Sequence, residues 1–195
     1  MFTLNARTMV EEIGITAEHL NRGHVILYPT DTIWGIGCDA TNSQAVQRIY
    51  EIKQRSDRKS MLVLMSDPEM LDLYLKWVPE RALEIIRSTT KPTTIIYPGA
   101  IRLASNLLAK DGSIGIRITS DPFCRKLIES TGLPIVSTSA NISGNPSPDT
   151  FRDIESGILE KVDHVVNWRQ DEITPSGHST IIRLDDRGRS TIIRA

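Results

Sequence analysis

Five short stretches of the sequence carry the hydroxyl, amide and basic side chains that could bind a ligand. They are residues 29–32, residues 53–59, Arg117, residues 137–141 and residues 179–180. Lysine and arginine neutralise phosphate or carboxylate groups, and small hydroxyls donate hydrogen bonds in tight places. Together these residue types are what a polyanionic ligand requires.

Several familiar catalytic patterns are missing from the sequence. Ser139 lacks the flanking glycines of a nucleophile elbow, which argues against an acyl-enzyme serine. There is no Walker-type glycine loop and no dinucleotide fingerprint. The histidines at 19, 24, 164 and 178 are scattered without metal-ligand spacing, so we expect no metal held by the protein itself. These absences favour a reaction in which a substrate attacks a phosphorus atom. Such a reaction needs positioning and charge neutralisation by the protein more than a nucleophilic side chain.

Each stretch also has an interpretation that involves no ligand. Thr30 and Thr32 could cap a turn after Pro29. The basic residues from Lys53 onward could form a solvated helix end, since cations suit the C-terminal end of the helix dipole. Arg117 is harder to explain without a partner, because it continues an alternating strand pattern.

Alternating helix-like and strand-like segments must position these residues, which predicts an α/β fold with a closely mixed sheet. Helices are expected over 7–22, ended by Gly23, and over 41–55, and two more begin at Asp67-Pro68 and Asp121-Pro122, the second ending at Gly132. Strands are expected over 24–28, 61–65, 94–97, 114–118 and 134–137. Segments 180–184 and 191–194 flank a turn sequence and predict an antiparallel hairpin. In such sheets ligands gather at the C-terminal ends of strands.

Composition limits the class of protein. The 195 residues suit one domain, residues 1–195, with 39% hydrophobic and 24% charged residues. A net charge of -1 gives no global basic field. No apolar run approaches the roughly 20 residues that span a bilayer, and no secretory signal is evident. Cys38 and Cys124 are isolated and suit buried positions in a reducing compartment, so we expect a cytoplasmic protein.

The order and spacing of the polar stretches resemble the YrdC/TsaC family of threonylcarbamoyl-AMP synthases over nearly the whole chain. The landmarks are Tyr28-Pro29-Thr30-Asp31-Thr32, Trp34-Gly35-Ile36-Gly37, Lys53-Gln54-Arg55, Gly115-Ile116-Arg117, Ser137-Thr138-Ser139-Ala140-Asn141-Ile142-Ser143-Gly144 and Ser179-Thr180-Ile181-Ile182. The resemblance implies a twisted open sheet of parallel and antiparallel strands flanked by helices.

The resemblance also implies a reaction. The family joins L-threonine, bicarbonate and ATP, with magnesium, into threonylcarbamoyl-AMP and releases pyrophosphate. Downstream transferase proteins would then pass the threonylcarbamoyl group to the adenosine beside the anticodon of certain tRNAs. In the implied mechanism a carbamate of threonine attacks the α-phosphorus of ATP, and Asp31 is the nearest candidate for a base.

Individual roles follow from the same resemblance. The family's polar tetrad around the triphosphate corresponds to Lys53, Arg55, Ser139 and Asn141, which are the expected catalytic residues. Further nucleotide contacts are expected from Lys59, Ser147 and Arg194. The residues expected to hold threonine are Thr32, Arg117, Ser137, Ser179 and Thr180.

Some positions depart from the usual family pattern. Ser56 and Ser60 stand where proline is common, Leu64 stands where some members place a histidine for threonine, and Trp34 replaces a tyrosine. The chain ends at Ala195 without the C-terminal domain of longer relatives, so a loop must close the site or the site stays open.

Two other functions remain open. One is a double-stranded RNA-binding or ribosome-maturation module that uses the basic cluster around Lys53. The other is a diverged paralogue with an altered substrate. A monomer and a homodimer are both compatible with the sequence.

Overall fold

The computed structural model describes residues 7–55, 61–173 and 177–195. The helices are α1 (Met9–Asn21), α2 (Ser43–Ile52), α3 (Leu71–Tyr74), α4 (Glu80–Ser88), α5 (Pro122–Thr131) and α6 (Ser156–Leu159), with short 3-10 helices at Pro68–Met70, Ser105–Leu107 and Phe151–Asp153. The strands are β1 (Ile26–Tyr28), β2 (Gly35–Gly37), β3 (Leu62–Met65), β4 (Thr93–Tyr97), β5 (Ile114–Ile118), β6 (Ile135–Ser139), β7 (His164–Val165), β8 (Thr180–Leu184) and β9 (Ser190–Arg194).

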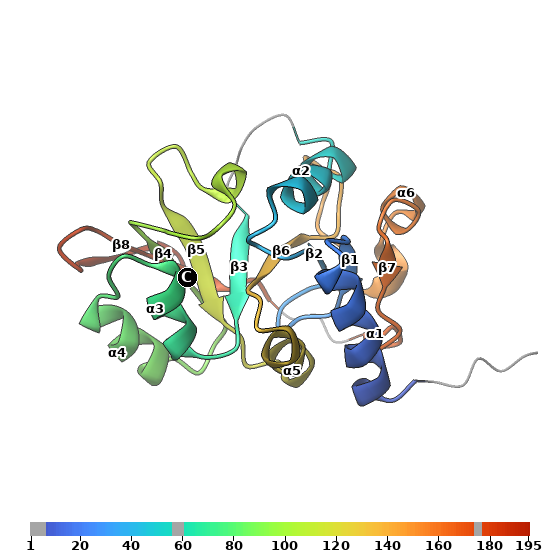
Figure 1. Cartoon of the computed structure of the whole chain (residues 1–195), viewed down its shortest axis with the longest axis horizontal. Coiled ribbons are helices and arrows are strands. Elements are labelled where there is room, and N and C mark those ends of the chain that lie inside the picture. The colour runs from blue at the N-terminus through green and yellow to red at the C-terminus, as the bar shows by residue number, and fades with distance from the viewer. Residues whose placement is uncertain (1–6, 56–60, 174–176) are drawn as a thin grey trace, which may run out of the picture.

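The described strands form one twisted sheet in the order β7-β1-β2-β6-β3-β5-β4-β8-β9 (Figure 1). The pairs β1–β7, β3–β5 and β4–β8 are parallel, and the other neighbours are antiparallel. Helices flank this sheet, and α1 packs against α5 (Figure 1). The mixed, helix-flanked sheet confirms the predicted fold class.

Local sequence signals fix the helix ends. Thr8 and Glu11 form a capping box, so α1 begins at Met9, slightly later than predicted. The Asn42 side chain accepts hydrogen bonds from two backbone amides at the start of α2. Asp121 caps α5, which ends at Gly132 with φ 68°, as the sequence predicted.

Other boundaries differ from the prediction. Helix α2 ends at Ile52 instead of continuing to Arg55, because Gln54 takes the left-handed conformation with φ 49°. Asp67-Pro68 opens only a short 3-10 helix that leads into α3. Strand β6 extends to Ser139, so the polar stretch 137–141 is half strand and half loop.

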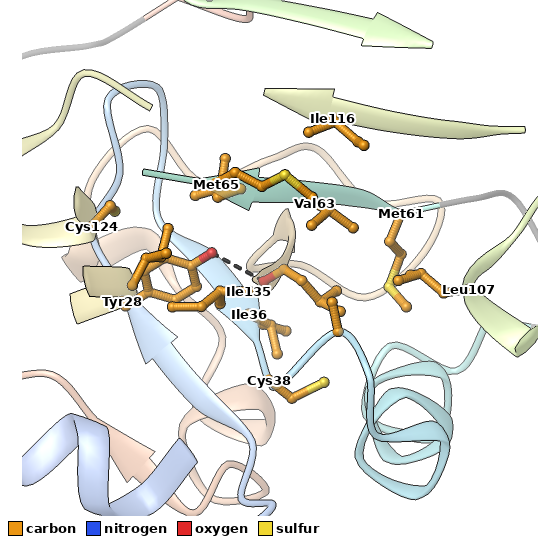
Figure 2. Packing of buried hydrophobic residues seen from close by; sticks show 14 of the residues in the cluster. Tyr28, Ile36, Cys38, Met61, Val63, Met65, Leu107, Ile116, Cys124 and Ile135 are labelled. Carbon is orange, nitrogen blue, oxygen red and sulfur yellow. Dashed lines mark hydrogen bonds between the residues drawn. The ribbon is translucent and has the colours of Figure 1, made fainter. Parts of the chain in front are cut away.

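The core lies between the sheet and its helices (Figure 2). Val63, Met65 and Ile116 are at most 2% exposed, and the Tyr28 hydroxyl donates a hydrogen bond to the Val136 carbonyl at 3.0 Å. Cys38 and Cys124 are free and fully buried, as predicted. Among the described helices, none combines the length and the apolar character that crossing a membrane requires.

Candidate active site

One row of cross-strand partners forms the floor of a cavity of about 330 Å³. Leu62 of β3 pairs with Ser137 of β6 and with Gly115 of β5, and Gly115 pairs in turn with Ile96 of β4. Directly opposed residues project from the same face of a sheet. The cavity therefore lies across the face of the central strands, whereas the sequence had suggested the C-terminal strand ends.

Two glycines keep this floor open. A Cβ atom on Gly35 would lie 3.2 Å from the Ser137 hydroxyl oxygen, and one on Gly115 would lie 3.2 Å from the Thr94 methyl carbon. Both separations are tighter than ordinary van der Waals contact, so a side chain at either position would crowd the residues that line the cavity. The sequence pattern included both glycines but did not show this role.

Arg117 enters the cavity wall from β5 as a buried cation. Its side chain is 2% exposed, its Nη2 lies 3.0 Å from the carboxylate of Asp31, and Nη2 also donates to the Thr32 hydroxyl at 3.3 Å. Its Nε has no hydrogen-bond partner among the residues that the structure describes. Asp31 is therefore the partner that the sequence led us to expect for this strand arginine. The Nε–H group of Arg117 remains available to a ligand, because it donates to no described protein group.

A second cationic group comes from the C-terminal strand. The Nε and Nη2 atoms of Arg194 donate to the Ser179 carbonyl at 3.1 and 2.8 Å. The Ser179 hydroxyl lies 3.0 Å from the hydroxyl of Thr94. The hairpin predicted from the sequence thus brings Arg194 against the start of β8, at the rim of the cavity.

Eight of the predicted site residues line this one cavity: Thr32, Arg55, Arg117, Ser137, Ser139, Ser147, Ser179 and Arg194. Residues to which the sequence interpretation gave no role also line it, among them Thr94 and His178. A single threonine within a strand or a histidine in a loop gave no motif by which it could be found.

The other predicted residues lie elsewhere. Thr180 is outside the lining, and its backbone amide donates to the Pro92 carbonyl. Lys53 and Asn141 lie behind the wall, because the Lys53 ammonium donates to the backbone carbonyls of Ser139 and Asn141. Lys59, like Ser56 and Ser60, falls outside the described residues.

Burial changes what Lys53 can do. The residue is 2% exposed, and burial together with nearby Arg55 lowers its pKa to about 8. Lys53 is therefore no part of a solvated helix end. Arg48, in helix α2, pairs with Asp163. Lys53 and Arg48 therefore do not offer a free basic surface for RNA.

Three of the four histidines lie together in space, whereas His178 lines the cavity. His19 and His24 approach through their Nδ1 atoms at 2.9 Å, and His164 stacks on His19 with ring centroids 4.5 Å apart. His164 also contacts the buried carboxylate of Glu12 at 2.8 Å. Within the described part of the chain, no group of histidine, cysteine and acidic residues could hold a metal ion.

The sequence matches a known family over residues 18–195. The matching family model is Sua5/YciO/YrdC, described as telomere recombination. This chain belongs to that family. One curated relative in the Sua5/YciO/YrdC family is the threonylcarbamoyl-AMP synthase of Vibrio parahaemolyticus, which is 32% identical over 178 residues, covering 90% of this chain and 94% of the relative.

Solved structures of the Sua5/YciO/YrdC family share the fold. A variant of P. abyssi Sua5 superposes with a TM-score of 0.84 at 25% identity, covering 96% of this chain and 57% of that chain. A second structure, of P. abyssi Sua5 complexed with L-threonine, gives a TM-score of 0.81 at 24% identity, covering 96% of this chain and 54% of that chain. This chain therefore spans little more than half the length of P. abyssi Sua5.

Proposed function

We propose that this chain is a threonylcarbamoyl-AMP synthase, which joins L-threonine, bicarbonate and ATP and releases pyrophosphate. The observation that carries the proposal is a single cavity lined by three arginines, 55, 117 and 194, together with serine and threonine hydroxyls. Such a lining suits two anionic ligands side by side, namely a triphosphate and a carboxylate. Curated relatives of this length carry the same activity in their names.

Threonine binds against Arg117, with Thr32, Ser137 and Ser179 around it. The Nε atom of Arg117 is buried and lacks a protein acceptor among the described residues, so it can donate to the threonine carboxylate. Asp31 pairs with the same guanidinium and offsets its charge inside the protein. The complex of P. abyssi Sua5 with L-threonine supports a threonine site in this fold.

ATP places its phosphates near Arg55, Ser139 and Ser147, and Arg194 contributes a further cation. These arginines neutralise the charge that grows on pyrophosphate as it leaves. The amine of threonine and bicarbonate form a carbamate with loss of water. A carbamate oxygen then bonds to the α-phosphorus while the bond from that phosphorus to the bridging oxygen of pyrophosphate breaks.

Magnesium enters with ATP in this proposal. The described lining residues include no aspartate or glutamate, so the cavity wall offers no carboxylate ligand for the ion. When bound to the phosphates, magnesium would supply additional neutralisation of their charge. The protein's own contribution is the placement of the arginines and hydroxyls.

The product would be consumed by transferases that modify tRNA beside the anticodon. Because tRNA is the final acceptor, we place the protein in the cytoplasm. The cavity is lined within one chain, so a monomer and a homodimer could both carry the reaction.

Pyrophosphate release tests the proposal. We expect release to require ATP, L-threonine and bicarbonate together, and to fall about a hundredfold in Arg55→Met, which removes one preorganised cationic contact. Arg87→Met removes an exposed arginine outside the cavity and serves as the matched control. Release that continues without threonine would contradict the proposed reaction, and a parent-like rate in Arg55→Met would contradict the assigned role.

A further inference from the structure

The charge of Lys53 points into the protein wall and away from the cavity. Lys53 follows the last residue of α2, is 2% exposed and is not among the lining residues. Its ammonium donates to the Ser139 carbonyl, donates to the Asn141 carbonyl at 2.7 Å and lies 3.4 Å from the Asn141 amide oxygen. An ammonium has three hydrogens, so these three oxygens account for all of them.

The same segment is also held to the backbone of Lys53 by a further hydrogen bond. The Ser143 backbone amide donates to the Lys53 carbonyl at 2.9 Å. Asn141 in turn donates through its side chain to the Asn145 carbonyl at 2.6 Å. The end of α2 is thus fastened to the chain on both sides of Asn141, directly behind the cavity wall.

Ser137 and Ser139 project from that fastened strand into the cavity. Burial of an ammonium is costly unless the charge is fully hydrogen-bonded, and here it is bonded only to protein oxygens. A cation in this position can act on the ligands through the strand that it holds.

We propose that Lys53 is a positioning residue that holds the 139–141 segment in place for both substrates and makes no contact with the nucleotide. The inference rests on the proposed function, which sets threonine beside Ser137 and the triphosphate beside Ser139. It replaces the expectation from the sequence that Lys53 neutralises phosphate charge directly. If Lys53 positions the 139–141 segment, loss of its ammonium should weaken both threonine and ATP binding. If Lys53 contacts the phosphates directly, only ATP binding should weaken.

Separate binding measurements on Lys53→Met distinguish the roles. Calorimetry would measure the binding of L-threonine alone and of a non-hydrolysable ATP analogue alone to the 195-residue protein. We expect Lys53→Met to weaken both ligands, each by about tenfold to a hundredfold, because small displacements of positioning groups have effects of this size. Lys161→Met changes an exposed lysine and should leave both affinities at the parent values.

The pH dependence gives a further readout. A neutral amine has only two hydrogens for the three oxygens. Burial, together with the charged neighbour Arg55, lowers the pKa of Lys53 to about 8. Affinity of the parent for the ATP analogue should therefore fall as pH rises through 8. Lys53→Met should lack this fall.

A structure of the parent with the ATP analogue tests the same claim without a variant. The Lys53 ammonium should remain on the oxygens of Ser139 and Asn141, and an ammonium turned onto a phosphate would overturn the inference. Loss of ATP-analogue affinity alone in Lys53→Met, with parent-like threonine binding, would also overturn it. A parent protein that binds neither ligand would overturn the proposed function and this inference with it.

Discussion

Replacing Arg117 by methionine should separate the two roles of the buried ion pair with Asp31. The pair joins Nη2 and the carboxylate at 3.0 Å, with side chains 2% and 8% exposed. Arg117→Met keeps the aliphatic stem but leaves the Asp31 carboxylate buried without its counter-charge. The variant should therefore lose both stability and threonine affinity, for different reasons.

The expected loss of stability in Arg117→Met follows from the burial of the ion pair. Removing one partner of a buried ion pair typically costs about 3–5 kcal/mol of unfolding free energy, because the remaining charge is uncompensated. In a chain of this size about 1 kcal/mol shifts the melting temperature by about 2–4 °C, so we expect a decrease of about 6–20 °C. Adding Asp31→Asn removes the second charge and should restore most of that stability.

Threonine binding should not recover in the double variant. Hydrogen bonds to a charged group contribute about 1.5–3 kcal/mol, so affinity should fall about tenfold to a hundredfold in both variants. Thermal unfolding and calorimetry with L-threonine measure the two effects separately. A melting temperature of Arg117→Met equal to that of the parent would contradict the stabilising role of the ion pair. Parent-like threonine affinity in the double variant would contradict the binding role of Arg117.

Three further predictions concern the cavity floor, a helix end and the histidine cluster. Gly35→Ala places a methyl group 3.2 Å from the Ser137 hydroxyl oxygen and should weaken threonine binding on the order of tenfold, as measured by calorimetry. Unchanged affinity would show that neighbouring residues move to make room for the methyl group. Thr8→Ala removes the capping box of α1 and should lower the unfolding free energy by about 1 kcal/mol in urea while pyrophosphate release stays at the parent rate. Burial and the nearby His164 and His24 lower the pKa of His19, so protonation favours the unfolded chain and stability should fall as pH drops below about 6.5. His19→Gln should flatten this dependence in thermal unfolding between pH 7 and 5, and an unaltered slope would assign it to other groups.

Features set by neighbouring residues could be predicted from the sequence. The Asp121-Pro122 start and the Gly132 end of α5 depend on local backbone conformation, and the structure confirms both. The alternating pattern of β5 likewise predicted residues 114–118 without error. Strand β2 was missed because Gly35–Gly37 is too short for a pattern and is fixed by its pairing with β1 and β6.

Features set by distant contacts could not be predicted. The residue type of Lys53 indicated a phosphate ligand, yet its direction is determined by carbonyl groups 86 and 88 residues further along the chain. His164 meets His19 only because β7 pairs with β1 at the far edge of the sheet. Eight of the twelve site residues expected from the sequence line the cavity, whereas the separation of lining residues from supporting residues required the fold.

Detection of the product is the most direct test of the proposed activity. Purified protein would be incubated with ATP, L-threonine and bicarbonate, and the mixture analysed by mass spectrometry for threonylcarbamoyl-AMP. We predict that the product mass forms only when all three substrates are present and that it is strongly reduced with Arg55→Met. Absence of the product from a folded protein that binds ATP and threonine would contradict the proposed function.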